Sequence, residues 1–294
     1  ANQGAVAVYN NLYLRNPLKL WRGAGTAIPV FSLRSLEDYG VGDFYDLYKL
    51  IDWAEASKQR VIQLLPINDT TMSRSWEDSY PYNANSAFAL HPMYLRPDAI
   101  GELDDKALLK RFRDRAKVLN SLPEVDYVEA NKLKEEFAKA LYAQLGKKVV
   151  SSVPFRAFVK NNSEWLKPYA AYSLLRDEFN TADFRNWGEY SEYEYQKIEL
   201  YLQKNKDAAN YVYFVQYFLD KQLREVRNYA HKHNVVLKGD IPIGISPVSV
   251  DAWADPRLYN MDCQAGAPPD DFSVLGQNWG FPTYNWEVMR RDGY

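Results

Sequence analysis

The amino-acid sequence predicts an α/β fold, namely a partial (β/α)8 barrel of about the first three strands with a large helical insertion between strands two and three. Three segments rich in apolar and β-branched residues have the composition of buried parallel strands. A helix-periodic segment joins the first two and makes a strand–helix–strand unit with a right-handed crossover. A long, charged and helix-periodic stretch separates the second strand from the third. In such a barrel, functional side chains gather at the carboxyl ends of the strands.

The predicted strands are Gly25–Phe31, Arg60–Ile67 and Asn234–Ile245. Each is a nearly continuous apolar run, as expected for strands that are covered on both faces. A doubly wound nucleotide-binding sheet is the alternative fold, and it would need more strands and a Gly-rich turn directly after a strand. The Gly-rich piece "GAGTA" (residues 23–27) instead begins ahead of its strand, so the barrel is the favoured arrangement.

Helical periodicity predicts one helix between the first two strands and several helices in the insertion. The first covers residues 43–59, with Asp43 as its expected N-cap. Its apolar face is formed by Leu47, Leu50, Ile51 and Ala54. Helices of the insertion are expected within residues 103–148, 155–180 and 207–233. The Lys/Glu-rich face of residues 129–141 and the charged pieces "FRDRA" and "LRDEF" are expected to face solvent.

The chain is expected to be part of one domain with three regions. Residues 1–100 hold the first strands and a binding loop, residues 101–233 form the helical insertion, and residues 234–294 hold the third strand and a second loop. The chain does not begin with Met, so we expect that it is processed or belongs to something longer, and no signal peptide is visible.

Composition excludes several functions. The net charge of −2 gives no general attraction to nucleic acid or to an anionic membrane, and no apolar run is long enough to span one. One cysteine, Cys263, permits no internal disulfide and fits a cytoplasmic location. Three histidines, of which His231 and His233 stand at a solvated helix end, do not suggest a metal site. Neither a metal nor another cofactor is expected.

Two long loops carry the candidate binding residues. One follows the second predicted strand, and the other follows the third and includes "GAPPDDFSVLGQNWGFPTYNW" (residues 266–286). Long structured loops at strand ends are usually functional. Aromatic residues make up 15% of the chain, and Trp and Tyr suit sugar rings because they combine an apolar body with a polar tip. The sequence therefore leans toward carbohydrate binding.

Several long motifs, in order, resemble the 4-α-glucanotransferase family (amylomaltase or disproportionating enzyme, glycoside hydrolase family 77). Residues 21–95 carry "RGAG", "PVFSLRS", "YGVGDF", "QLLPIND" and "DSYPYNANSAFALHPMYL". Residues 239–294 carry "GDIPIGIS", "VDAWADP" and the loop quoted above. The forms "WRGAG", "LLPINDT" and "GQNWGFPTYNW" most resemble the branch of the plant cytosolic enzyme and its bacterial relatives. The resemblance covers nearly the whole chain from Trp21 onward.

The resemblance implies a retaining transfer of α-1,4-glucosyl units from maltose or malto-oligosaccharides to glucan or glucose acceptors. Such chemistry uses a carboxylate nucleophile and an acid/base carboxyl group about 5–5.5 Å apart. In the family, both follow the segment that resembles "WEVMRRDGY", so we expect the nucleophilic Asp and the acid/base Glu to lie beyond residue 294. These 294 residues alone are therefore expected to be inactive.

The resemblance also assigns roles to residues of this chain. Asp240 in "GDIPI" is the expected supporting carboxylate, which orients the sugar at the reaction centre. Ser79 and Tyr82 match a sugar-contacting motif, although this chain has one additional residue there, Tyr80. Asp270, Gln277 and Trp279 match the loop that covers the glucan. Asp271 stands where an aromatic residue is commoner.

Two other functions stay open on the sequence alone. One is a catalytically inactive glucan-binding module, and the other is an amylase-like α-glucan hydrolase, against which the loop at residues 266–286 argues. The expected partners are α-1,4-glucans, maltose and malto-oligosaccharides, with no nucleic acid and no membrane. A three-strand piece of a barrel leaves an edge uncovered, so we also expect possible self-association through that edge.

Overall fold

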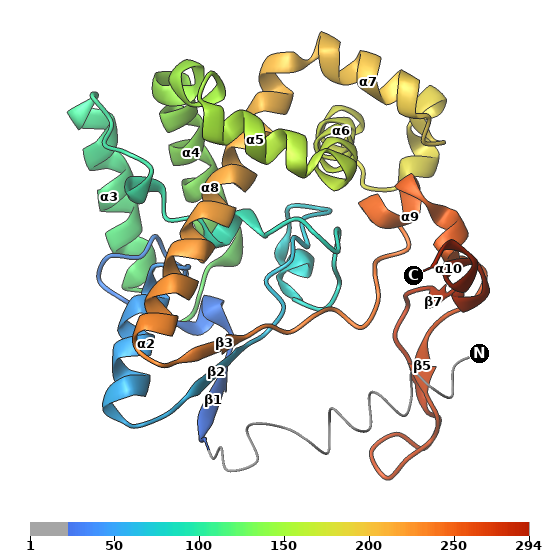
Figure 1. Ribbon diagram of the computed structural model, residues 1–294, viewed down its shortest axis with the longest axis horizontal. Coiled ribbons are helices and arrows are strands. Elements are labelled where there is room, and N and C mark those ends of the chain that lie inside the picture. The colour runs from blue at the N-terminus through green and yellow to red at the C-terminus, as the bar shows by residue number, and fades with distance from the viewer. Residues whose placement is uncertain (1–22, 294) are drawn as a thin grey trace.

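The computed structural model describes residues 23–293 and shows a small parallel sheet beside a large helical region (Figure 1). The N-terminal expectations, including the absent signal peptide and the start of the "WRGAG" motif, lie outside the described residues. Among the helices that the structure describes, none is both long and apolar enough to cross a membrane.

The sheet consists of β1 (Gly25–Ile28), β2 (Val61–Leu64) and β3 (Val236–Lys238) in the order β1-β2-β3. Both pairings are parallel, with Ile62 opposite Thr26 on one side and Leu237 on the other, which confirms the predicted strand direction. All three strands are shorter than the sequence predicts. Pro29 and Pro66 explain the early ends of β1 and β2, because proline cannot donate a hydrogen bond to a neighbouring strand.

Helix α2 (Asp46–Ala56) connects β1 to β2 and buries Leu47, Ile51 and Ala54, as the apolar spacing predicts. The prediction that Asp43 caps this helix is wrong. The N-cap position belongs to Tyr45, which makes no capping hydrogen bond with its side chain. The Asp43 carboxylate is fully buried, and its Oδ2 pairs with Arg96 and Lys134. Its Oδ1 accepts the backbone N–H of Tyr45, so Asp43 stabilises the turn just before the helix and also holds two cations from distant segments.

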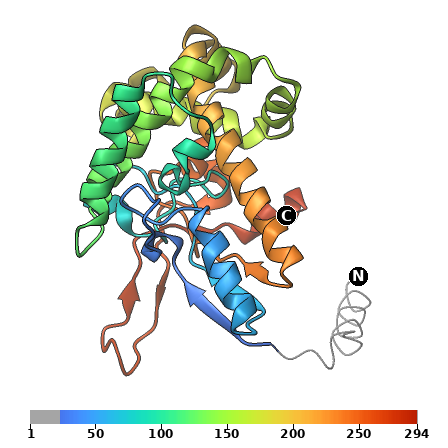
Figure 2. The ribbon, with the colours of Figure 1, turned by 90° about the vertical axis from the view of Figure 1, so that its left-hand side faces the viewer.

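Between β2 and β3 the chain forms six helices, and Figures 1 and 2 show them gathered beyond one end of the sheet. They are α3 (Lys106–Asn120), α4 (Tyr127–Val150), α5 (Val153–Asn161), α6 (Ser163–Phe179), α7 (Tyr195–Lys204) and α8 (Lys206–Lys232). Helix α8 confirms the predicted amphipathic helix. It packs on α4 and α6 and then returns to α2 and β3, so it joins the helical region to the sheet.

The expectation that two charged segments face solvent is wrong in part. Lys134 of α4 is only 2% exposed, and Arg176 in "LRDEF" is only 6% exposed. Lys134 pairs with the buried Asp43, and Arg176 donates to the carbonyl oxygen of Thr71 and pairs with its neighbour Asp177. In contrast, Arg113 and Asp114 of "FRDRA" are exposed, as expected.

After β3 the chain forms short elements that end in a projecting arm. Helix α9 (Val250–Ala254) is followed by β4 (Tyr259–Asn260), which pairs with β7 (Thr283–Tyr284). Strands β5 (Gly266–Ala267) and β6 (Gln277–Asn278) pair as the stem of the arm, and α10 (Trp286–Asp292) follows. Both ribbon views show this arm extending away from the helical region (Figures 1 and 2).

Candidate functional site

Tyr82 and Asp240 come together beyond the carboxyl ends of β2 and β3. The Tyr82 hydroxyl donates a hydrogen bond of 2.9 Å to Oδ2 of Asp240. This bond to a carboxylate raises the pKa of Tyr82 above its usual value. Asp240 lies two residues after β3 and not within a strand, because β3 ends at Lys238. Two predicted site residues thus form one half-exposed polar unit.

Buried carboxylates hold the loop that carries Tyr82. Asp78, within the 3-10 turn Trp76–Ser79, accepts backbone N–H bonds from Met72, Ser73 and Arg74. Ser79 ends this turn and is half-buried. These bonds satisfy the backbone of a loop that has no sheet or helix to pair with.

Asp69 fixes the same loop at its start. Its carboxylate accepts hydrogen bonds from Tyr169 of α6, at 2.9 Å, and from Asn85, at 3.2 Å. Neither Asp69 nor Asp78 was predicted as a supporting residue. The visible signal was an Asp followed by Thr in "NDTT", a pattern typical of a side chain that bonds the backbone two residues on, as Asp69 does to Thr71.

The arm carries the other three predicted site residues. Asp270 accepts the backbone N–H groups of Phe272 and Ser273, so it shapes the turn at the tip. Oε1 of Gln277 accepts a 2.9 Å hydrogen bond from the indole N–H of Trp279, which is 39% exposed. The side chains of Gln277 and Trp279 thus form a polar and aromatic pair on the stem.

Within the described residues, the hydrogen bonds of the arm and of the Tyr82–Asp240 pair are separate. Among residues 23–293, no side-chain hydrogen bond joins Asp270, Gln277 or Trp279 to either residue. The base of the arm is nevertheless tied to the segment after β3, since the Tyr284 hydroxyl donates to the carbonyl oxygen of Ile243. The Phe281 ring packs against Gly244. A Cβ at residue 244 would lie 2.4 Å from this ring, so the contact requires glycine.

Asp251 of α9 connects the segment after β3 to the loop after β2. Its carboxylate accepts the backbone N–H of Ala87 at 2.8 Å. Burial raises the pKa of Asp251 to about 6, with only backbone hydrogen bonds opposing the shift. The two loops that hold the candidate residues are therefore fixed to one another away from the strands.

The fold is that of an α/β protein, and the candidate binding residues supply carboxylates, amides and aromatic rings in segments that follow the carboxyl ends of parallel strands. Such groups suit a neutral, hydroxyl-rich ligand. Within the described part of the chain, no group of three or more His, Cys, Asp or Glu residues is placed to hold a metal ion.

The family is shown by comparison: a family model described as 4-alpha-glucanotransferase matches residues 28–294, and the chain belongs to this family. It is 46% identical over 277 residues to "4-alpha-glucanotransferase DPE2" of Oryza sativa subsp. japonica, covering 93% of this chain and 29% of that protein. It is 32% identical to a 4-alpha-glucanotransferase of Chlamydia caviae, covering 92% of this chain and 50% of that protein. The chain thus spans half or less of these relatives.

Solved structures agree with the family. An amylomaltase from Streptococcus agalactiae in complex with acarbose matches with a TM-score of 0.77 and 25% identity, over 92% of this chain and 55% of that chain. An amylomaltase from Corynebacterium glutamicum matches with a TM-score of 0.72 and 18% identity, over 92% of this chain and 38% of that chain, and supports the fold.

Proposed function

We propose that this chain is the N-terminal part of the catalytic domain of a 4-α-glucanotransferase. The whole protein would move α-1,4-glucosyl units from maltose or malto-oligosaccharides to glucan or glucose acceptors. The family match and the names of the relatives support this proposal. The observation that carries it to particular residues is the Tyr82–Asp240 hydrogen bond, which sets a carboxylate and a phenol side by side at the strand ends.

The proposed reaction is a retaining double displacement. A carboxylate attacks the anomeric carbon while an acid/base carboxyl group protonates the leaving oxygen, and a sugar hydroxyl then releases the glycosyl unit. The nucleophile and the acid/base residue would be supplied by sequence after residue 294. In this chain, Asp240 would orient the reacting sugar through its free lone pairs, and Tyr82 and Ser79 would contact the same sugar.

The arm would have a second role in the transferase reaction. A covalent glycosyl intermediate is hydrolysed unless an acceptor hydroxyl is better placed than water. Trp279 offers an exposed ring, Gln277 an amide, and Asp270 a carboxylate at the tip. We propose that these three residues cover the bound glucan and exclude water once sugar is present.

The proposal includes the domain arrangement. About the first three strands of a (β/α)8 barrel, with their glucan-binding loops, would come from residues 1–100 and 234–294. The helical insertion would consist of residues 101–233. The parallel order β1-β2-β3 and the placement of six helices between β2 and β3 support it. The single cysteine is consistent with a protein that works in the cytoplasm.

Maltotriose binding tests the proposed function. Replacing Asp240 with Ala is expected to weaken binding about tenfold or more, because a charged hydrogen-bond partner contributes about 1.5–3 kcal/mol. Replacing Trp279 with Ala is expected to weaken it by a similar factor through lost stacking on the sugar. Isothermal titration calorimetry on the purified chain measures both changes. Trp53→Ala, at an exposed site on α2, is the matched control and should leave affinity unchanged.

When the same preparation is incubated with maltotriose and glucose, it should bind maltotriose but form no disproportionation products. Products would contradict the placement of the catalytic carboxylates outside these residues. Affinity that is equal in wild type, Asp240→Ala and Trp279→Ala would contradict the assigned glucan contacts.

We also propose that the chain alone associates with itself through the uncovered edge of β3. Val236 is 50% exposed, Ile241 79% and Ile243 58%, an unusual density of apolar surface beside a strand with one free edge. Light scattering should report species larger than a monomer that dissociate when Ile241 and Ile243 are replaced with Lys. A wild-type monomer at all concentrations would count against this edge as an interface.

A further inference from the structure

The loop that carries Tyr82 is closed on itself by hydrogen bonds. The backbone N–H of Asn85 donates to the carbonyl oxygen of Asp69, and its side-chain amide donates to the Asp69 carboxylate. Within the loop, Asp78 accepts the backbone N–H of Arg74 at 2.6 Å. Because these bonds join the two ends of the loop and fix its middle, we expect the loop to move as one unit that includes Tyr82.

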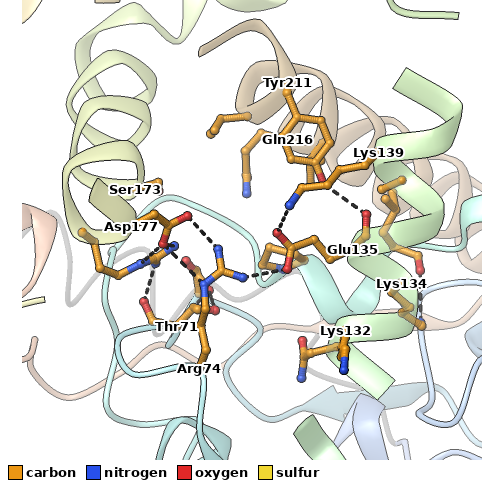
Figure 3. A pocket seen from close by; sticks show the side chains of 18 of the residues that line it. Thr71, Arg74, Lys132, Lys134, Glu135, Lys139, Ser173, Asp177, Tyr211 and Gln216 are labelled. Atoms are coloured by element: carbon orange, nitrogen blue, oxygen red, sulfur yellow. Dashed lines mark hydrogen bonds and ion pairs between the residues drawn. The ribbon is translucent and has the colours of Figure 1, made fainter. Parts of the chain in front are cut away.

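A cavity of about 490 Å³ lies between this loop and helices α4, α6 and α8 (Figure 3). Asp69, Thr71, Arg74 and Asp78 line it from the loop side, and Val212 is one of the residues that line it from α8. Side chains on opposite sides of a void lack the close contacts that fix two packed elements relative to one another. The position of the loop against the helices therefore depends on the polar contacts around the cavity.

Arg74 makes the polar contact that reaches two of these helices. Its guanidinium pairs with Glu135 of α4 at 2.6 Å and with Asp177 of α6 at 2.8 Å, and Figure 3 shows it between the two carboxylates. Asp177 also pairs with Arg176, which donates to the carbonyl oxygen of Thr71. One guanidinium fork thus holds the loop against two walls of the cavity.

The backbone of Arg74 is strained, which distinguishes it from an ordinary surface arginine. Its φ is +59°, a left-handed conformation that residues other than glycine rarely adopt. The Asp78 carboxylate and the two ion pairs hold it there. Strained residues that several partners fix cluster at functional sites. Glycine would satisfy the backbone of this position more easily, so the arginine side chain has a role beyond the turn.

We propose that Arg74 is a positioning residue, an ionic tether that sets where the loop places Tyr82 relative to Asp240. Tyr127 of α4 and Tyr169 of α6 also donate to the loop, so loss of the tether should shift the loop and not release it. Because the loop moves as one unit, the shift should weaken the 2.9 Å hydrogen bond from Tyr82 to Asp240. The consequence for glucan rests on the proposed function, in which these two residues contact the same sugar.

Salt gives the tether a signature that an apolar contact lacks. The Arg74 side chain is 46% exposed, so dissolved ions screen its ion pairs. The screening length falls from about 10 Å at about 0.1 M salt to about 3 Å at about 1 M. Maltotriose carries no charge, yet its affinity for the wild-type chain should fall about threefold over this range. In Arg74→Gly the affinity should already be about threefold weaker at low salt and should not change with salt.

NMR of the chain labelled with ¹³C at tyrosine Cζ tests the tether without any sugar. The Tyr82 resonance, identified by its loss in Tyr82→Phe, reports the hydrogen bond to Asp240. It should shift in Arg74→Gly and in Arg74→Ala, and it should return toward its wild-type position in Arg74→Lys, which retains a cation. Glu135→Gln removes the α4 partner without changing the loop and should shift the resonance in the same direction.

Arg185→Ala is the matched control. Arg185 is an exposed arginine of the insertion whose ion pair is with Asp183, outside the loop. In this variant, both the Tyr82 resonance and the maltotriose affinity should match those of the wild type at both salt concentrations.

The outcomes separate the tether from the proposed function. A Tyr82 resonance that is the same in wild type, Arg74→Gly, Arg74→Ala and Glu135→Gln overturns the tether, whether or not maltotriose binds. A resonance that shifts as expected, with no maltotriose binding in the wild type, supports the tether and contradicts the proposed glucan contacts. A shifted resonance with an unchanged, salt-independent affinity supports the positioning of Tyr82 and contradicts its role in holding glucan.

Discussion

Replacing Lys134 with Met is expected to lower the free energy of unfolding by about 3–5 kcal/mol, because it leaves a buried carboxylate with one fewer cation. The Lys134 ammonium donates to Oδ2 of Asp43 at 2.9 Å and to the carbonyl oxygens of Met93 and Leu95 at 2.7 and 3.1 Å. Its side chain is 2% exposed and that of Asp43 is 0% exposed. Methionine fills similar space but donates to none of these oxygens.

The loss of stability should affect more than α4, because Asp43 also accepts a 2.7 Å hydrogen bond from Arg96. This cluster links the start of α2, the segment before the insertion and α4, so it attaches the helical region to the sheet side of the molecule. Urea unfolding followed by circular dichroism measures the change. Lys49→Met is the matched control, since the Lys49–Glu37 pair is more than half exposed on both sides and should contribute little to stability. Equal losses in the two variants would contradict a structural role for the buried cluster.

This cluster also shows which features of the fold can be predicted from patterns in the sequence. The strand positions, the parallel direction and helix α8 follow from apolar periodicity, which is a local property. The burial of Lys134 does not, since its partner Asp43 is 91 residues away along the chain. A charged helix face predicts solvent exposure unless a distant opposite charge is brought to it, and periodicity carries no information about that charge.

The candidate site also has features that the sequence predicts and features that it does not. Tyr82 and Asp240 were predicted singly, from loop positions and from a family resemblance, and the fold brings them into contact across 158 residues. Asp270, Gln277 and Trp279 were predicted as part of the same site, yet in this structure their hydrogen bonds stay within the arm. The cavity of about 490 Å³ between α4, α6, α8 and the loop after β2 was not predicted at all, because no single segment encodes how these four parts pack.

Replacing Trp253 with Ala is expected to lower the free energy of unfolding by about 3–5 kcal/mol, the range for truncating a fully packed aromatic side chain. Trp253 is 2% exposed and lies edge-on to Trp187 and Tyr193, with ring centroids 5.4 and 5.1 Å away. Its indole N–H donates to the carbonyl oxygen of Tyr190 at 2.9 Å. The substitution would leave a large void and remove the hydrogen bond to the Tyr190 carbonyl oxygen.

The position of this cluster gives the substitution a functional consequence. Trp253 lies on α9, between β3 and the arm, and its partners Trp187, Tyr190 and Tyr193 belong to the insertion. A second link from the insertion is the Tyr172 hydroxyl, which donates to the carbonyl oxygen of Val248. Loss of Trp253 should therefore loosen the segment that carries Asp240 at one end and the arm at the other. Maltotriose affinity should fall together with stability, although the aromatic and hydrogen-bond partners of Trp253 in the described residues include neither Asp240 nor Trp279.

Near-ultraviolet circular dichroism, urea unfolding and calorimetry on one preparation measure these effects. Trp53→Ala removes the same side chain from a site that is 49% exposed, so its loss of stability should be far smaller and its maltotriose affinity normal. Tyr172→Phe removes the hydroxyl that donates to the carbonyl oxygens of Val248 and Ala182 and should weaken the same attachment by about 1 kcal/mol. If Trp253→Ala destabilises the chain no more than Trp53→Ala, the aromatic cluster does not fix the arm. If stability falls while affinity is unchanged, the glucan contacts do not depend on how α9 is held against the insertion.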